Sequence, residues 1–306
     1  MKFICAQPAI DYYVWQVEVM INNFIENGVN PNDMHILCAH YGIISQKWGK
    51  LKEAYPKVNF FFYTDTREDR SYIPSIYFNL MKQHLQANPE LEKEALFLHD
   101  CDITFTKPVD FSSMAYDKIW YLSDTVGYIG TQYILTKGED VYNKMCKVMG
   151  MDPMIPKLMN SNSGGAQHIV KNTTYEYWEK VEKDSIKLYA HFCKEEPKWK
   201  GEGHVIQKWT AGMWSLLWNA WMAGHETKVD KRLDFCWATD SIQKWEHCPI
   251  FHNAGVTKDR TDLFFKGAYI NKSPYNDIQL DKFSDKHCSY NYVKELLKTK
   301  EVSCLI

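Results

Sequence analysis

Over its first hundred residues the chain alternates short apolar runs with segments whose apolar residues recur at helical spacing. The second kind is clearest in residues 12–25, where the apolar positions are Val14, Val17, Ile21, Phe24 and Ile25. The apolar runs predict strands at 2–6, 34–39, 58–63 and 95–98, and the periodic segments predict helices at 12–25, 43–54 and 75–87. This alternation is typical of βαβ units, so we expect an α/β fold with a Rossmann-like, mostly parallel central sheet flanked by helices.

Beyond Pro108 the pattern is less regular. It predicts a strand at 119–122, a glycine-containing loop into an apolar run at 161–172, helices at 178–193, 211–223 and 292–300, and a polar, mobile loop at 194–203. No internal repeat or linker-like segment interrupts the chain. We therefore expect one domain over 1–306, with parts at 1–110, 111–257 and 258–306.

Composition narrows the class of protein. Hydrophobic residues make up 45% and charged residues 24% of the 306 residues, which is usual for a soluble globular protein. The 36 basic residues are balanced by 38 acidic ones, and this balance argues against nucleic acid as a partner. Aromatic residues reach 15%; they can stack on sugars and bases, but filling the core is the simpler explanation.

The cysteines and the apolar segments bear on the compartment. The nine cysteines are scattered and form no CxxC pair, which favours free thiols in a reducing compartment. No run is long enough for a signal peptide core or for the ~18 apolar residues of a membrane span. We expect a cytoplasmic protein without a transmembrane segment. The cysteines are Cys5, Cys38, Cys101, Cys146, Cys193, Cys236, Cys248, Cys288 and Cys304.

The stretch FLHDCDITF, at 97–105, carries the strongest chemical signal. Asp100 and Asp102 follow the fourth predicted strand, at the sheet edge where open α/β proteins bind ligands. Two carboxylates this close repel each other and need a counter-charge, for which a divalent cation is the usual candidate. Carboxylate oxygens suit Mn²⁺ or Mg²⁺. Since alternate residues of an extended chain face opposite sides, Cys101 is expected to pack inward, with His99 on the same side.

Two other interpretations of this stretch remain open. The two carboxylates could simply be solvated in a loop. Alternatively, residues 100–104 fit the DxDx[TV] motif of haloacid-dehalogenase-type phosphatases, in which Asp100 would be the nucleophile and Asp102 a general acid. Against the phosphatase, three predicted strands precede the motif and no adjacent Asp-Asp pair follows it.

A third interpretation rests on a resemblance over roughly residues 1–255. The chain resembles nucleotide-sugar glycosyltransferases of the A fold (GT-A), in which a DxD motif ends a central strand. It is also similar to enzymes that glycosylate hydroxyproline or serine in plant cell-wall proteins. The stretches that carry the resemblance are Tyr13-x-Trp15-Gln16, FLHDCDITFTKPVDF at 97–111, Gly164-Gly165-Ala166-Gln167, WTAGMW at 209–214 and Phe251-His252-Asn253.

The resemblance implies roles for these residues around a Mn²⁺ or Mg²⁺ ion. Asp102 would bind the metal directly, Asp100 would bind it through ribose or water, and His252 would complete the sphere. A structural, hydrogen-bonded His252 is the alternative. The donor would be a nucleotide-sugar, with UDP favoured, and the acceptor a hydroxyl of a glycan or glycoprotein; the oligomeric state is not predicted.

Further candidates surround the expected nucleotide and sugar. The nucleotide would meet Gln7, Pro8, Tyr12, Tyr13, Asp65, Arg67 and, at its ribose, Asp100. The sugar and acceptor would meet Asp124, Gly164, Gly165 and Gln167, with glycines admitting a close approach. The loop at 194–204 would be a lid that excludes water.

The catalytic base is the least defined part. Inverting members of this family often place a carboxylate base at the position that reads Thr210-Ala211-Gly212 here, and this stretch has no acid. Asp240 and Glu202 are the alternative bases, and Gln167 is a further catalytic candidate. Retention of configuration, with a leaving phosphate oxygen as base, is slightly favoured. A non-catalytic sugar-binding protein of the same fold is the alternative from another class.

Overall fold

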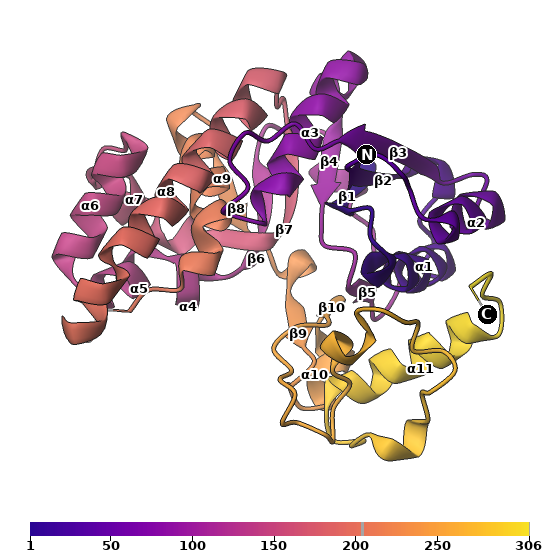
Figure 1. Ribbon diagram of the computed structural model, residues 1–306. Coiled ribbons are helices and arrows are strands. Elements are labelled where there is room, and N and C mark those ends of the chain that lie inside the picture. Colours follow the sequence, from indigo (N-terminus) through magenta and orange to yellow (C-terminus); the bar gives the residue numbers. More distant parts are fainter. Residues whose placement is uncertain (203–204, 306) are drawn as a thin grey trace. The chain divides into compact units, whose positions relative to one another are not determined.

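The computed structural model describes residues 1–202 and 205–305 and divides into two compact units, which are described separately (Figure 1). The terminal unit comprises Lys2–Thr64, His99–Phe111 and the chain from Arg232 onward. The central unit comprises Asp65–Leu98 and Ser112–Lys231, together with Met1. Strands and helices occur in both units, so the expectation of an α/β fold is confirmed.

In the terminal unit, three parallel strands lie in the order β3-β2-β1. Their bounds are Lys2–Pro8 for β1, Met34–His40 for β2 and Asn59–Thr64 for β3. The helices between them are α1 (Asp11–Glu26) and α2 (Gln46–Ala54). All of these elements were predicted from the sequence to within a few residues. The strands are apolar runs, and the helices show apolar residues at helical spacing.

A second, three-stranded sheet in the terminal unit has the order β5-β10-β9. β10 pairs antiparallel with β5 and parallel with β9. Its strands are β5 (Ile103–Phe105), β9 (Phe235–Trp237) and β10 (Ile250–His252), and the helices nearby in sequence are α10 (Gln243–His247) and α11 (Cys288–Lys300). Short 3₁₀ turns include η1 (Pro31–Asp33), η7 (Lys266–Tyr269) and η8 (Leu280–Lys282).

The central unit holds strands in the order β4-β7-β6-β8, antiparallel on both sides of β7 and parallel between β6 and β8. The strands are β4 (Ala95–Leu98), β6 (Trp120–Asp124), β7 (Gly164–Lys171) and β8 (Thr227–Val229). The helices are α3 (Ser75–Ala87), α4 (Val126–Ile129), α5 (Thr131–Thr136), α6 (Glu139–Met149), α7 (Met154–Leu158), α8 (Tyr175–Glu202) and α9 (Ala211–Met222). The 3₁₀ turns are η2 (Pro89–Lys93), η3 (Ser112–Met114), η4 (Asn160–Asn162) and η5 (Lys208–Thr210); η6 (Lys231–Leu233) runs from this unit into the terminal one.

The expected loop at 194–204 is wrong as far as residue 202, because α8 continues through it and packs against α3 and α9 (Figure 1). The side chain of Trp199 is only 1% exposed and lies in the core beside Phe192. Glu195 and Glu196 form ion pairs of 2.8 and 2.6 Å with Lys144 and Lys208. Aromatic burial and ion pairing thus favour the helix despite Pro197, whose missing N–H removes one helical hydrogen bond. Residues 203 and 204 lie outside the described chain.

The stretch at 161–172, predicted as a glycine-containing loop into an apolar run, is largely strand β7, which begins at the glycines themselves. The register against β6 shifts between Leu122 and Ser123, and Ala166 adopts a φ of 66°, as in a β-bulge. The start of this strand was not predicted, because the bulge interrupts the alternation of inward-facing and outward-facing side chains.

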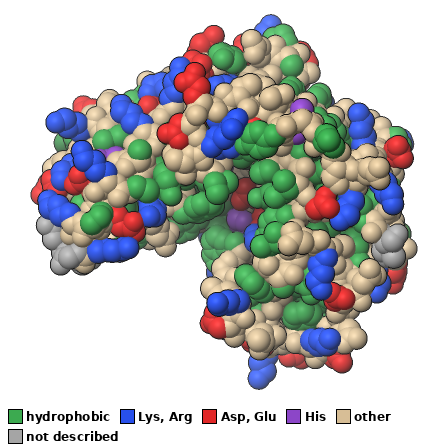
Figure 2. Space-filling view, in the orientation of Figure 1, with side chains coloured by type: hydrophobic (Ala, Val, Ile, Leu, Met, Phe, Trp, Pro, Cys, Tyr) green, Lys and Arg blue, Asp and Glu red, His purple; other side chains and the backbone are tan. Residues whose placement is uncertain are grey.

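Each unit has its own aromatic core. In the central unit, the Trp214, Leu217, Trp218 and Trp221 stripe of α9 is 0–7% exposed, so its expected role in core packing is confirmed. In the terminal unit, side chains of α1 and α11, such as Trp15 and Tyr292, share a core with Phe251 and Phe264. Among the described residues, no helix is long and apolar enough to cross a membrane. Figure 2 shows acidic and basic side chains interspersed over the visible face, in keeping with the net charge of −2.

Buried His168 on β7 predicts an acid-sensitive step in stability. Its side chain is 7% exposed and its Nε2 has no hydrogen-bond partner among the described residues. Burial lowers the pKa of His168 from 6.5 to about 4. The unfolded chain therefore binds a proton that the folded chain excludes, and stability is lost as pH falls from 6.5 towards 4, by about 2 kcal/mol at pH 5.

Urea unfolding at pH 7 and pH 5 checks this expectation. The difference in unfolding free energy between the two pH values should shrink by about 2 kcal/mol in His168→Leu. It should stay unchanged in the control His247→Leu, at an exposed position. An unaltered pH dependence in His168→Leu would contradict the assignment.

Candidate metal centre

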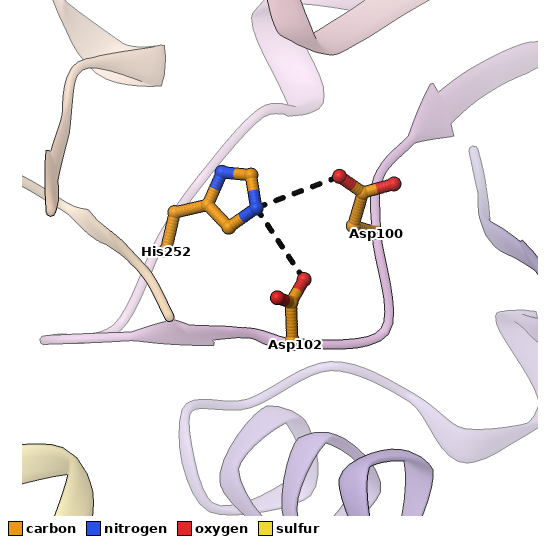
Figure 3. Close-up of side chains that lie close together, drawn as sticks. All are labelled: Asp100, Asp102 and His252. Carbon is orange, nitrogen blue, oxygen red and sulfur yellow. Dashed lines mark ion pairs between the residues drawn. The ribbon is translucent and has the colours of Figure 1, made fainter. Parts of the chain in front are cut away.

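Backbone pairing between β5 and β10 brings the two predicted acidic residues next to a histidine far along the chain. His252 lies opposite Ile103 in the antiparallel register, and the backbone N–H of Asn253 donates to the carbonyl of Asp102 at 3.0 Å. Asp100 and Asp102 stand in the turn that precedes β5 (Figure 3). Main-chain hydrogen bonds therefore fix the backbone positions of Asp102 and His252 next to each other.

Asn23 of α1 anchors the other end of β5. Its side-chain oxygen accepts from the N–H of Phe105 at 2.7 Å, and its side-chain nitrogen donates to the Phe105 carbonyl at 3.0 Å. Both bonds are buried. Because unpaired buried backbone groups cost free energy, Asn23 is the polar contact that holds this short strand against the helix.

The three side chains converge on one point. His252 Nε2 lies 3.5 Å from an oxygen of Asp100 and 3.4 Å from an oxygen of Asp102. Figure 3 shows this ring nitrogen pointing at both carboxylates. One ligand atom from each residue lies within 4.8 Å of the others, and among the described residues this is the only such group of histidine, cysteine or acidic side chains.

This donor set fits a hard divalent cation. Two carboxylate oxygens and one imidazole nitrogen suit Mn²⁺ or Mg²⁺ better than a thiophilic ion. The side chains of Asp102 and His252 are 6% and 9% exposed, whereas that of Asp100 is 55% exposed. The cluster is thus closed on one side and open at Asp100, where an ion or substrate has access.

Cys101, between the two acids, takes no part in this group. Its side chain is buried, as expected from alternation along an extended chain. His99 is buried as well, tilted against the ring of Phe24, with its Nδ1 bonded to the carbonyl of Asp100. The expectation that both residues pack inward is confirmed.

Lys266 of η7 is a site residue that sequence patterns did not reveal. Its ammonium forms an ion pair with Asp102 on the carboxylate oxygen not facing His252. The neighbouring Phe264 is fully buried in the core of the terminal unit and so positions the turn. No motif marks Lys266 in the sequence, and only an apolar Leu-Phe-Phe run before it hinted that this polar region returns to the core.

The charges of the cluster compensate one another. Burial alone would raise the pKa of Asp102, but the charges of Lys266 and His252 outweigh it and hold that pKa well below its ordinary value. Burial lowers the pKa of the His252 imidazole, but the negative charge of Asp102 outweighs this effect and raises that pKa. Protein atoms around Asp100 and the charge of Asp102 raise the pKa of Asp100, although its side chain stays 55% exposed. A divalent cation could replace the positive charges that now stabilise these carboxylates.

Trp237 supports the imidazole from β9. Its ring stacks on His252 at a centroid distance of 5.1 Å and an angle of 26°. Asp240 in turn accepts from the Trp237 N–H at 2.8 Å and forms an ion pair of 2.9 Å with Lys244. Asp240 therefore has a clear structural task, and its role as a base stays a prediction. The side chain of Glu202 lies outside the described residues.

The aromatic pair predicted to meet a nucleotide base lies near the cluster. Tyr12 and Tyr13 open α1, half-buried, with ring centroids 4.9 Å apart in an edge arrangement. Burial raises the pKa of Tyr13, and the nearby charges of Cys101, Asp102 and Asp100 raise it further. Helix α1 also contacts β5, the strand that follows the two acids.

Gln7 and Pro8 lie at the end of β1. Gln7 is buried and its amide donates to the Leu37 carbonyl at 3.0 Å. Pro8 is the last residue of the strand, paired with Ala39 of β2. Gln7 is thereby held against the neighbouring strand, and contact of either residue with a nucleotide remains a prediction.

The other predicted residues belong to the central unit. Asp65 and Arg67 are buried and bind each other, with Arg67 Nη2 2.8 Å from an oxygen of Asp65 and Nη1 donating to the Ser75 hydroxyl at 3.0 Å. Because the charges of Asp65 and Arg67 compensate each other inside the protein, a structural role is sufficient to explain this buried ion pair. Their roles toward a nucleotide stay predictions.

The structure does bring the predicted sugar-binding residues Asp124, Gly164, Gly165 and Gln167 together, on β6 and β7. Asp124 pairs with Gly164, and the buried Gln167 side chain accepts from the Ser123 hydroxyl at 2.7 Å. A Cβ on Gly164 would lie 2.3 Å from the Cβ of Leu122, so strand packing is sufficient to require this glycine.

Comparisons with known proteins add little to this geometry. No family model matches the sequence, and no curated protein matches it. Among solved structures, the apo structure of the bifunctional glycosyltransferase WbbM is similar, with a TM-score of 0.49 and 11% sequence identity. The match covers 99% of this chain and 51% of that one, so this chain spans about half of its length. A likeness of this degree does not identify a function.

Asn23→Ala should destabilise the protein by about 1–3 kcal/mol, because it removes two buried hydrogen bonds to the backbone of Phe105. Denaturant unfolding of the purified variant measures the loss. Asn32→Ala, at an exposed position, is the matched control and should change stability by less than about 0.5 kcal/mol. Equal stability of the two variants would show that Asn23 does not anchor β5.

Lys266→Met should raise the affinity for Mn²⁺ at least about tenfold, since the ammonium competes for Asp102 and repels an incoming cation. Calorimetric titration of the protein with Mn²⁺ alone measures this change. Lys272→Met, which removes an exposed ion pair with Asp277, should leave the affinity unaltered. Weaker Mn²⁺ binding in Lys266→Met would mean that the cation does not occupy the Asp100–Asp102–His252 cluster.

Proposed function

We propose that the protein is a metal-dependent glycosyltransferase that moves a sugar from a nucleotide-sugar, with a UDP-sugar favoured, to a hydroxyl of a glycan or glycoprotein. The observation that supports it most is the convergence of His252, on β10, with Asp100 and Asp102, in the turn before β5. The α/β architecture and the resemblance of the DxD stretch to GT-A enzymes support it as well. A family likeness to hydroxyproline or serine glycosyltransferases remains a finer expectation.

Each residue of the cluster has a task in this proposal. Asp102, His252 and Asp100 would hold a Mn²⁺ or Mg²⁺ ion, with Asp100, as the exposed member, also in reach of ribose. Such an ion supplies positive charge that stabilises the negative charge growing on a departing nucleoside diphosphate. Lys266 would leave Asp102 when the ion binds, and its ammonium would then meet the diphosphate.

The residues near the cluster would bind the nucleotide. Tyr12 and Tyr13 offer ring faces for a base at the start of α1. Gln7, Pro8, Asp65 and Arg67 are the remaining nucleotide candidates. For the sugar and the acceptor, the candidates are Asp124, Gly164, Gly165 and Gln167, the last also as a catalytic residue.

The proton of the acceptor hydroxyl needs a base. Asp240 is engaged by Trp237 and Lys244, which makes its carboxylate less available for that task. This engagement favours a retaining reaction, in which an oxygen of the leaving phosphate takes the proton. Glu202 stays the other candidate for an inverting reaction.

Incubation with a panel of UDP- and GDP-sugars and Mn²⁺ tests the proposal. We expect slow, metal-dependent release of UDP, reduced at least about 100-fold in Asp102→Asn, because this change removes the negative charge of the acid and leaves only a weaker, neutral oxygen for the metal. Asp262→Asn, an exposed acid of the same unit, is the control and should keep the wild-type rate.

The other outcomes separate the alternatives. Sugar-nucleotide binding without turnover would favour a non-catalytic sugar-binding protein. Release of phosphate from simple phosphomonoesters would favour the phosphatase with Asp100 as nucleophile. Absence of both metal-dependent binding and turnover over the whole panel would refute the glycosyltransferase.

A further inference from the structure

A cavity in the terminal unit is lined by residues that have no part in the metal centre. Its volume is about 380 Å³, and its walls come from α1, from α2, from the loop after η7 and from the segment after α11 (Figure 1). The walls include Asp11 and Trp15 of α1, Lys47 of α2, Asn276 and Leu305. Among the described residues, its lining includes none that the sequence predicted for a metal, nucleotide or sugar. The volume lies within the range of small-molecule sites, ~300–1,000 Å³.

The cavity and strand β5 lie on different faces of α1. Asp11, Trp15 and Glu18 follow one another at intervals of four and three residues, so they share one stripe of the helix. Asn23, which holds β5, comes five residues after Glu18 and is therefore turned by roughly 140° about the helix axis. The cavity is thus on another side of α1 than the strand that follows the acids of the metal centre.

A buried carboxyl group holds the walls of this cavity together. Glu18 is 0% exposed, and the Tyr275 hydroxyl donates to it at 2.8 Å. The Ser303 hydroxyl and the Cys304 N–H donate to the same group at 2.7 and 3.0 Å. Tyr275 lies within the lining loop, and Cys304 directly precedes the lining residue Leu305. Because a buried carboxyl group without partners is costly, these bonds fix both segments against α1 and give the cavity a defined shape.

The charged side chains that line the cavity form two pairs of opposite sign. Lys47 lies 2.8 Å from Asp11, and Lys272 forms an ion pair with Asp277. The four charges cancel, and an ion that one member of a pair attracts is repelled by the other member. A simple anion or cation is therefore a poor ligand for this cavity. A zwitterion would have to break both ion pairs before it could form its own.

The other polar side chains of the lining offer hydrogen-bond donors and acceptors together. Asn271 and Asn276 each carry a donor nitrogen and an acceptor oxygen, and Ser273 carries a hydroxyl. Val14 and Leu305 add apolar surface. A ligand rich in hydroxyl groups suits this set, because each hydroxyl both donates and accepts and can bond to the outer atoms of an intact ion pair. The C–H groups of such a ligand match the apolar side chains.

We propose that this cavity binds a neutral mono- or disaccharide, at a second site that is separate from the metal centre and independent of the proposed transfer reaction. The ammonium groups and amide nitrogens donate to the sugar oxygens, and the carboxylates and amide oxygens accept from the sugar hydroxyls. Lys272 and Asn276 are exposed, so the sugar enters from their side. No covalent bond is made or broken there. The site holds a carbohydrate and does not act on it.

Titration of the full chain with free sugars tests the proposal. The probes are glucose, galactose, mannose, N-acetylglucosamine, maltose and cellobiose, and saturation-transfer NMR measures their binding in EDTA and without nucleotide. We expect at least one of these sugars to bind saturably. Because neither a metal ion nor a nucleotide is present, this result does not depend on the transferase assay, and either experiment can fail without the other.

Variants of two exposed lining residues locate the binding. Lys272→Met should weaken it at least about tenfold and Asn276→Ala about threefold, because a hydrogen bond from a charged donor is the stronger one. Lys57→Met and Asn32→Ala change exposed residues of the same unit outside the cavity and should leave the affinity unaltered. Substitutions at exposed positions such as these four have little effect on folding, and urea unfolding checks each variant.

Three results would overturn the proposal. The first is the absence of saturable binding by every sugar of the panel. The second is binding that Lys272→Met and Asn276→Ala both leave unchanged, because the sugar would then lie elsewhere. The third is binding of inorganic phosphate or glycine that is lost in Lys272→Met and that none of the sugars displaces, since the cavity would then serve a charged ligand.

Discussion

The antiparallel pairing of β5 with β10 is the constraint on which the candidate site depends. Neither strand is longer than three residues, so neither is stable by itself. Their pairing is reinforced by the Asn253–Asp102 backbone bond, by Asn23 on α1 and by the core around Phe251. A late segment of the chain is thereby brought to an early one, and the site exists only once the whole terminal unit has folded.

Such a site also has to solve an electrostatic problem. Asp102 is buried beside a second carboxylate, an arrangement that costs several kcal/mol unless positive charge lies close by. Here His252 and Lys266 provide it from opposite oxygens of the same carboxylate. The cluster is thus stable without an ion, yet its donors are of the kind that a divalent ion prefers, so ligand exchange can occur without refolding.

The parts of this arrangement that depend on neighbouring residues in the sequence could be predicted from the sequence. The parallel strands and helices of the first hundred residues follow from periodicity, and the acids at 100 and 102 stand out after an apolar run. His252 was found from its place after two apolar residues and from family resemblance. Lys266 and Asn23 could not be found, because an isolated Lys in a polar region and an Asn within a helix carry no signal until tertiary contacts give them partners. The continuation of α8 past Pro197 was missed for the same reason: burial of Trp199 is a tertiary effect.

The strand that carries His252 has a different kind of neighbour on each side. On one side of β10 the pairing with β5 leads to oxygen ligands, and on the other side β9 carries the buried thiol of Cys236, which shares a core with Cys248 and Cys288. Trp237, next to Cys236 on β9, stacks on His252, so the imidazole is supported from the side of β9 as well as through the β5–β10 pairing. Because three-residue strands have few hydrogen bonds of their own, this support from both neighbouring strands holds the strand that carries the imidazole in place.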